Sequence, residues 1–198
     1  MKKMFVLSFA MLFVLCLTQP LVSQSLDWQI QFLRVKDRES MRINRTIPLE
    51  NGDQFSLIVK ADSDCYLYVF WYDTERETFL LHNEFLKGGA EENFDSLIRP
   101  FKLDEPSGTE TIYVITSLSR QEELEKLIDL NENSPSRQNN NNLYREIVRL
   151  QNAASNLGEP AAAIITSGGT SRGAGETQNF ATKFTGKETY VRAISIRH

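Results

Sequence analysis

Apolar and polar residues alternate in several stretches of the first two thirds of the chain, and this alternation predicts half-buried β-strands. Trp28, Ile30 and Phe32, for example, are separated from one another by single glutamines. Turn-forming residues such as the Asn-Gly-Asp segment at 51–53 precede or separate these stretches. Strands are therefore expected at residues 28–32, 55–59, 78–82 and 111–117, and we expect them to form an antiparallel meander.

Residues 65–72 (CYLYVFWY) differ from these stretches because their apolar and aromatic run is unbroken. Acidic turn segments bound the run on both sides, at 62–64 and 73–75. A strand without a polar face is typical of the middle of a sheet that is covered on both sides. We expect Cys65 to Tyr72 to be that central strand.

Two helices are expected after the strands. Ser119 and Glu122 have the spacing of a capping box, and Leu124 and Ile128 then fall on one face of a short helix that ends near Asn131. The second helix has apolar residues at helical spacing, and Gly158 and Pro160 follow it. Its apolar positions are Leu143, Ile147, Leu150 and Ala154.

The segment between the two helices, residues 133–142 (NSPSRQNNNN), is polar and low in complexity. It has no apolar periodicity, which indicates a flexible surface loop. The alternative is that the asparagine amides make contacts of their own. Two last strands are expected at 161–167 and 189–196, and the second should return to the main sheet. The expected fold class is mainly β with two helices (α+β), as an antiparallel β-sandwich-like domain.

The N-terminus has the pattern of a signal peptide. Lys2 and Lys3 precede an apolar stretch at 4–17 that is too short to span a bilayer, and Pro20 ends it. Residues 1–25 are therefore expected to be removed, leaving one domain at 26–198. The mature chain has no further apolar run long enough for a transmembrane helix. We expect an exported protein that is periplasmic, at the outer surface or extracellular, with lipidation at Cys16 as an alternative.

Charge and cysteine content narrow the function classes. The full chain has 22 Lys and Arg against 26 Asp and Glu, and loss of Lys2 and Lys3 leaves 20 against 26, so the formal net charge falls from -4 to -6. An acidic chain without basic patches argues against a nucleic-acid partner. Loss of Cys16 leaves Cys65 as the one cysteine, so no intramolecular disulfide can form.

Five short motifs recur in a family pattern: Gly52-Asp53 before a strand, YLYVF at 66–70, Leu81-His82-Asn83, SGTE at 107–110, and YVI at 113–115 followed by Ser117. Across about residues 50–120 they resemble a bacterial family catalogued as domain of unknown function number 4384. The resemblance implies a small β-rich sandwich that is often appended to exported or signalling proteins, sometimes beside caspase-like peptidase or kinase domains. His82 departs from the pattern, because the family tends to have a proline there.

The chain offers few residues for catalysis or metal binding. A Cys65 thiolate with His82 as its base would make a cysteine-dependent hydrolase, but a cysteine beside an aromatic run is more often a core residue. Zinc binds three or four Cys, His or carboxylate ligands, and the mature chain has one Cys and two His, so a structural zinc site is not expected. Asp62, Asp64 and Asp73 fit turn formation better than a calcium loop. We expect no catalytic set, no cofactor and no bound metal.

The glycine-rich segment at 167–175 is the candidate ligand site. Its glycines allow backbone N–H groups to converge on an anion, and a guanidinium could add a bidentate contact. The candidate ligand-binding residues are Gly168, Gly169, Arg172 and Gly173. The expected function is a non-enzymatic, exported binding or interaction module of the bacterial cell envelope, with a protein or glycan as its partner. The alternative is the hydrolase that uses Cys65 and His82.

Overall fold

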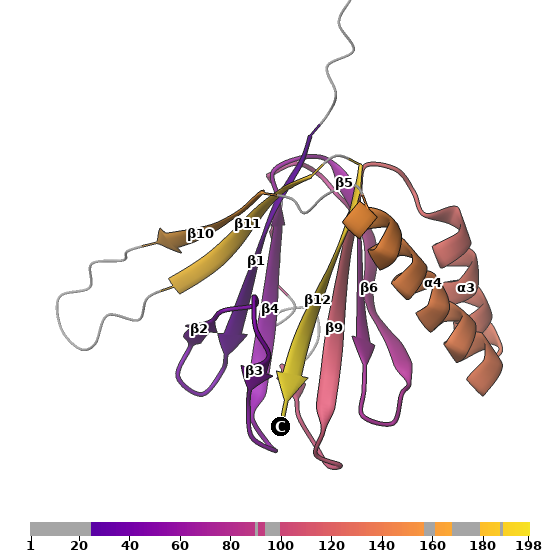
Figure 1. Ribbon diagram of the computed structural model, residues 1–198, viewed down its shortest axis with the longest axis horizontal. Coiled ribbons are helices and arrows are strands. Elements are labelled where there is room, and N and C mark those ends of the chain that lie inside the picture. The colour runs from indigo at the N-terminus through magenta and orange to yellow at the C-terminus, as the bar shows by residue number, and fades with distance from the viewer. Residues whose placement is uncertain (1–24, 90, 94–99, 157–160, 168–178, 187) are drawn as a thin grey trace, which may run out of the picture.

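The computed structural model describes residues 25–89, 91–93, 100–156, 161–167, 179–186 and 188–198. Two β-sheets pack face to face, and two helices cover the outer face of one of them (Figure 1). The seven-stranded sheet has the order β10 (Ala161–Ser167), β11 (Asn179–Gly186), β1 (Leu26–Arg34), β4 (Gln54–Ala61) and β7 (Glu91–Asn93), with β2 (Glu39–Met41) beside β1 and β8 (Phe101–Lys102) beside β4.

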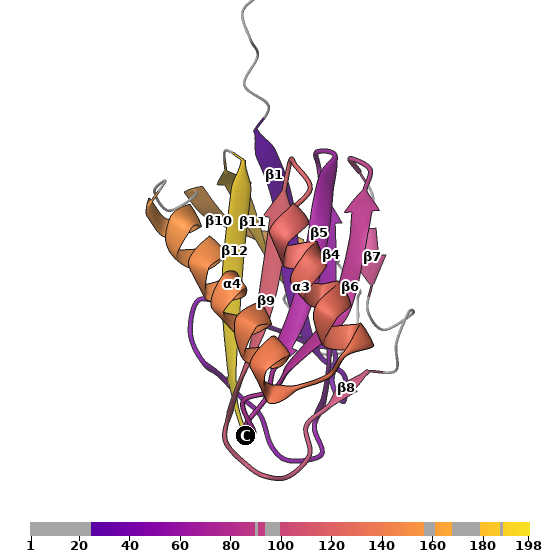
Figure 2. The same ribbon diagram turned by 90° about the vertical axis from the view of Figure 1, so that its right-hand side faces the viewer.

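The second sheet has five strands in the order β3 (Ile47–Pro48), β12 (Thr189–Arg197), β9 (Thr109–Ser117), β5 (Cys65–Tyr72) and β6 (Thr78–Leu86). Its pairs are antiparallel except the short pair of β12 and β3. Helices α3 (Glu122–Asn133) and α4 (Arg137–Asn156) lie over this sheet (Figure 2). The expected fold class, mainly β with two helices and sandwich-like, is confirmed.

The expected single meander is wrong. β4 and β5 follow each other in the chain but belong to different sheets, and β5 pairs with β6 on one side and with β9 on the other. A single layer would leave the apolar face of β1 and β4 without a partner, whereas two stacked sheets bury that face. The chain therefore crosses from one sheet to the other at residues 62–64.

β5 contributes to two hydrophobic cores. Cys65, Leu67 and Val69 point into the core between the sheets, where Trp28 and Phe55 of the opposite sheet are fully buried. The alternate residues of β5, among them Tyr68 and Phe70, pack under the two helices. The expectation of a central strand covered on both faces is confirmed, because each face of β5 meets a separate apolar layer.

The apolar stripes of both helices face the second core as expected. Leu124 and Ile128 of α3 and Leu143 and Ile147 of α4 are almost completely buried there. The expected capping box is absent: α3 begins after Gln121, which makes no side-chain cap. Instead the backbone N–H of Gln121 donates to the Tyr68 hydroxyl, so a strand residue satisfies the start of the helix.

The expected flexible loop at 133–142 is wrong for most of its length, because α4 begins at Arg137 and the link between the helices is residues 134–136. Ser136 caps the helix, since its Oγ accepts the backbone N–H of Asn139 at 3.1 Å. The side-chain amide of Asn139 also donates to the Ser134 carbonyl at 2.7 Å. These bonds offset the weak helix propensity of the asparagine run.

The late strands follow the expectations, with one addition. β10 has the expected bounds, and β12 pairs with β9, so the last strand returns to the sheet that contains β5, separated from β5 by β9. β11 was not expected from the sequence; it pairs with β10 and β1 and carries buried Phe184. Gly158 and Pro160, expected to close the second helix, lie outside the described residues.

Candidate functional site

The glycine-rich ligand site stays a prediction. Gly168, Gly169, Arg172 and Gly173 lie outside the described residues. Strands β10 and β11, which pair antiparallel from Ser167 and Asn179 onward, precede and follow the segment in the chain.

Cys65 and His82 lie on neighbouring strands, but the structure does not bring them together. Cys65 pairs with Leu86, whereas His82 pairs with Val69, four residues further along β5. Four residues of strand correspond to about 13 Å, far beyond hydrogen-bond reach. Burial, aided by the nearby Asp64 carboxylate, raises the pKa of the Cys65 thiol to about 11. A neutral, buried thiol is a poor nucleophile, so the geometry gives the hydrolase alternative no catalytic pair.

The three turn aspartates do not converge. Asp62 and Asp64 precede β5 and Asp73 follows it, so they lie at opposite ends of the strand. Asp64 Oδ1 accepts the backbone N–H of Gly88 at 2.7 Å, and Asp73 Oδ1 accepts that of Glu77 at 2.8 Å. Within the described residues no group of three or more His, Cys, Asp or Glu side chains is placed to hold a metal ion.

An open groove of about 840 Å³ lies between the β5–β6 hairpin and the start of α4. Its hairpin wall consists of Glu75, Arg76, Glu77, Thr78 and Phe79. Its helix wall includes Asn131, Ser136, Arg137, Asn140 and Asn141. A second hollow of about 220 Å³ shares Thr78, Phe79 and Asn131 and extends towards α3. We call the two together the hairpin–helix groove.

The hairpin wall is held in a tight turn. The Asp73 side chain accepts the Glu77 backbone N–H, and the Asp73 carbonyl accepts that of Arg76 at 3.2 Å. Arg76 itself has φ of 67°, in the left-handed region that favours glycine. A long cationic side chain therefore occupies a backbone position at which glycine would be less strained, and it lies on the wall of the groove.

The helix wall is fastened to the hairpin through one asparagine. Asn140 Oδ1 accepts the backbone N–H of Thr78 at 3.2 Å, and its amide nitrogen donates to the Thr78 carbonyl at 3.1 Å. β6 is the edge of its sheet, and such an edge has backbone groups that need partners. Asn140 thus replaces a neighbouring strand at this position and fixes the width of the groove.

Two stacked tyrosines complete the lining of the groove. The rings of Tyr72 and Tyr144 lie 4.3 Å apart at an interplanar angle of 16°. Tyr113 meets Tyr144 edge to face at 6.3 Å. Burial and the neighbouring Tyr144 raise the pKa of Tyr72, so its hydroxyl stays protonated at neutral pH. The stack joins the hairpin to α4 and gives the groove a rigid base.

Several polar groups of the groove have no partner among the described residues. Thr78 is 1% exposed, and its hydroxyl makes no hydrogen bond there. Arg76 and Arg137, both exposed, form no ion pair with any residue that the structure describes. Buried polar groups are normally satisfied, and exposed guanidiniums with free donors can bind incoming groups. The arrangement is suited to holding a ligand.

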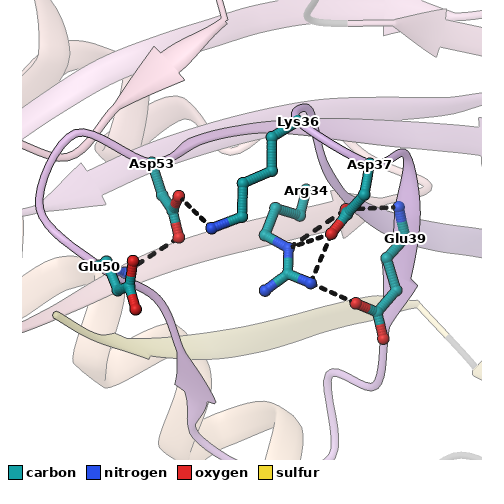
Figure 3. A network of polar contacts seen from close by, with 6 residues as sticks. All are labelled: Arg34, Lys36, Asp37, Glu39, Glu50 and Asp53. Atoms are coloured by element: carbon teal, nitrogen blue, oxygen red, sulfur yellow. Dashed lines mark hydrogen bonds and ion pairs between the residues drawn. The ribbon is translucent and has the colours of Figure 1, made fainter.

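A charged network in the β1–β2 hairpin and the turn before β4 shows the opposite arrangement (Figure 3). Arg34 binds both Asp37 and Glu39, and Lys36 Nζ lies 2.8 Å from Asp53 Oδ1. The hydrogen bond from Arg34 holds the pKa of Asp37 below its usual value, and that from Lys36 does the same for Asp53. These charged side chains already have partners within the fold.

One buried acid–base pair lies near the end of the described chain. His198 Nε2 is 3.4 Å from Glu110 Oε1, with side chains 0% and 7% exposed. Burial raises the pKa of Glu110, and the charge of His198 partly offsets this. Because both side chains are closed off from solvent, the pair fastens β12 to β9 and is not open to a substrate.

Sequence reasoning missed the hairpin–helix groove. The sequence predicts a flexible loop around Asn140, with contacts by the asparagine amides as the alternative, and the structure shows such contacts. The contact that forms the groove joins residues 62 positions apart, so a local pattern could not reveal it. The one available signal was an arginine in the turn segment 73–77 where glycine or asparagine is usual.

Comparison with known protein families, with curated proteins and with solved structures finds no match for this chain. The resemblance of residues 50–120 to the family of unknown function therefore stays a prediction. None of the helices that the structure describes is both long and apolar enough to cross a membrane. The function is therefore inferred from the geometry of the hairpin–helix groove.

Proposed function

We propose that this protein is an exported, non-enzymatic binding module of the cell envelope and that its ligand occupies the hairpin–helix groove. The observation that carries the proposal is a groove of about 840 Å³ whose two arginines, Arg76 and Arg137, have no ion-pair partner in the described part of the chain. A volume of this size lies within the usual range of ligand sites. Export is supported by the charged and apolar pattern of residues 1–25.

The chemistry of the lining supports binding over catalysis. Its titratable side chains are three carboxylates (Glu75, Glu77 and Glu132), two guanidiniums and two phenols, and Cys65 and His82 lie elsewhere. None of these lining groups makes the hydrogen bond between nucleophile and base that covalent catalysis needs. The walls are also fixed by the Asn140 clamp and the Tyr72–Tyr144 stack, and preorganised walls favour affinity.

The test is capture of envelope material by the immobilised protein. We expect the wild type to retain a component that the double variant Arg76→Ala, Arg137→Ala loses, because both free guanidiniums are removed. The matched control is the double variant Arg38→Ala, Arg145→Ala. It removes one arginine from the β1–β2 hairpin and one from α4, both exposed and neither on the groove wall. This control should retain the component.

A third variant separates the groove from the glycine-rich segment. Arg172→Ala should leave capture unchanged if the ligand binds in the groove. Loss of capture by Arg172→Ala together with retention by the groove variant would place the site in the segment at 167–175 instead. Equal retention by all variants would contradict a site at either place.

A further inference from the structure

We propose that the ligand of the hairpin–helix groove is an uncharged oligosaccharide. This inference rests on the proposed function, because it names the class of ligand for the same site. Its basis is the combination of charged side chains of both signs, a strand edge occupied at Thr78 and one exposed aromatic ring within the groove.

The groove has charged side chains of both signs. Arg76 and Arg137 face three carboxylates, those of Glu75 and Glu77 on the hairpin and that of Glu132 in the second hollow. An anion would meet repulsion from the carboxylates and a cation from the guanidiniums, so this mixed lining suits neither well. A sugar hydroxyl both donates and accepts hydrogen bonds, and can therefore use carboxylate acceptors and guanidinium donors together.

The polar groups that remain fit the same ligand. Asn131 and Asn141 line the groove with side-chain amides, each of which offers both a donor and an acceptor. Neighbouring hydroxyls of a sugar ring present paired donors and acceptors at the spacing that planar amide, carboxylate and guanidinium groups recognise.

The closed strand edge argues against an extended peptide. A peptide that adds to a sheet needs free backbone N–H and C=O groups on the edge strand. At Thr78, one of the two β6 residues that line both hollows, the side chain of Asn140 already occupies these groups. An added peptide strand therefore cannot pair with the edge at this residue, which favours a ligand without a peptide backbone.

Phe79 supplies an apolar surface. Its side chain lines both hollows, yet the residue is 47% exposed. Its ring stacks on no other ring that the structure describes, whereas the faces of Tyr72 and Tyr144 cover each other. A sugar ring has an apolar face of C–H groups that packs on an exposed aromatic ring while its hydroxyls bond to polar walls.

The experiment divides the envelope extract before capture by the immobilised protein. One portion is treated with periodate, which cleaves bonds between neighbouring hydroxyl-bearing carbons, and is then quenched; another is digested with a broad-specificity protease. We expect periodate to reduce groove-dependent capture at least fivefold and protease to leave it unchanged. Capture that survives periodate but is lost with protease would overturn the oligosaccharide while leaving the proposed function intact.

A pair of phenylalanine variants tests the same inference within the protein. Phe79→Ala should weaken capture of the periodate-sensitive material about tenfold, as expected for loss of an aromatic platform. Phe85→Ala is the matched control, because Phe85 is 49% exposed on the same strand but lines neither hollow. Equal capture by both variants would overturn the platform, and the absence of any groove-dependent capture would overturn the proposed function as well.

Discussion

Two charged regions of this molecule differ in where their charges are used. In the network around Arg34 and Asp53, each cation meets a carboxylate, and two of the carboxylates have lowered pKa values (Figure 3). In the hairpin–helix groove, Arg76 and Arg137 have no ion-pair partner within the described residues. In the first region the charged side chains form ion pairs that hold the turns together. In the second region the two guanidiniums line an open groove, and this position together with the missing ion pairs makes them available to a ligand.

The largest effect on stability is expected at Asn140, whose side chain joins α4 to the backbone of β6 at Thr78. Asn140→Asp replaces the amide donor with an oxygen that faces the Thr78 carbonyl, so one buried bond is lost and repulsion appears. We expect a loss of about 2–3 kcal/mol in the free energy of unfolding, measured by urea denaturation. Asn141→Asp, one residue on and without such bonds in the described structure, should change stability by less than about 0.5 kcal/mol.

The charged network should respond to acid. Asp53→Asn leaves one side-chain oxygen, which cannot accept both the backbone N–H of Glu50 at 3.1 Å and the Lys36 ammonium at 2.8 Å. We expect a cost of about 1 kcal/mol for the weakened bonding, to which the half-exposed Lys36 adds little because solvent screens it. The pKa of Asp53 is lowered from 3.8 in the folded state, so this stabilisation is present above that pH and disappears as the pH falls through the folded pKa.

Melting curves of wild type and Asp53→Asn between pH 2 and 7 measure this effect. The two should differ most near neutrality and converge in acid. A difference that stays constant over the whole range would show that the carboxylate charge of Asp53 does not contribute to stability.

The smallest effect on stability is expected at two arginines with positive φ. Their glycine variants should nevertheless differ clearly in ligand capture. Arg76 has φ of 67° and Arg38 has φ of 54°, so glycine at either position relieves strain and should stabilise the fold by about 0.5–1 kcal/mol. Arg76→Gly should also reduce ligand capture, whereas Arg38→Gly, outside the groove, should not. Calorimetry and the capture assay read the two effects separately.

If both variants gain stability and neither loses capture, the backbone strain at Arg76 has no connection with binding. A loss of capture by both would indicate that the strain itself, and not the position of Arg76 on the groove wall, is what matters.

The sequence predicts the elements well wherever apolar spacing dominates. β5 has the bounds expected from its unbroken run, and the apolar stripes of α3 and α4 meet the sheet as their periodicity indicates. The asparagine-rich start of α4 was missed because its helix depends on contacts made after folding, such as the Ser136 cap and the bond from Asn140 to β6. Tertiary contacts outweigh propensity there.

Two features could not be predicted from the sequence: the sheet to which each strand belongs, and the hairpin–helix groove. Nothing in the local pattern of residues 54–61 distinguishes a strand that pairs with β5 from one that stacks against it. The groove likewise depends on Thr78 meeting Asn140 across 62 positions. Such long-range meetings have no local periodicity and so leave no trace in windows of ten to twenty residues.

The position of β5 between two apolar cores has a consequence for the way in which the molecule opens. Hydrogen exchange at a backbone amide reports the smallest opening that exposes it. α3 and α4 can separate from the sheet without disturbing the layer between the sheets, but β5 has neighbours on both edges and apolar cover on both faces. Its amides should therefore exchange only through complete unfolding, so that their protection measures the global stability of the protein.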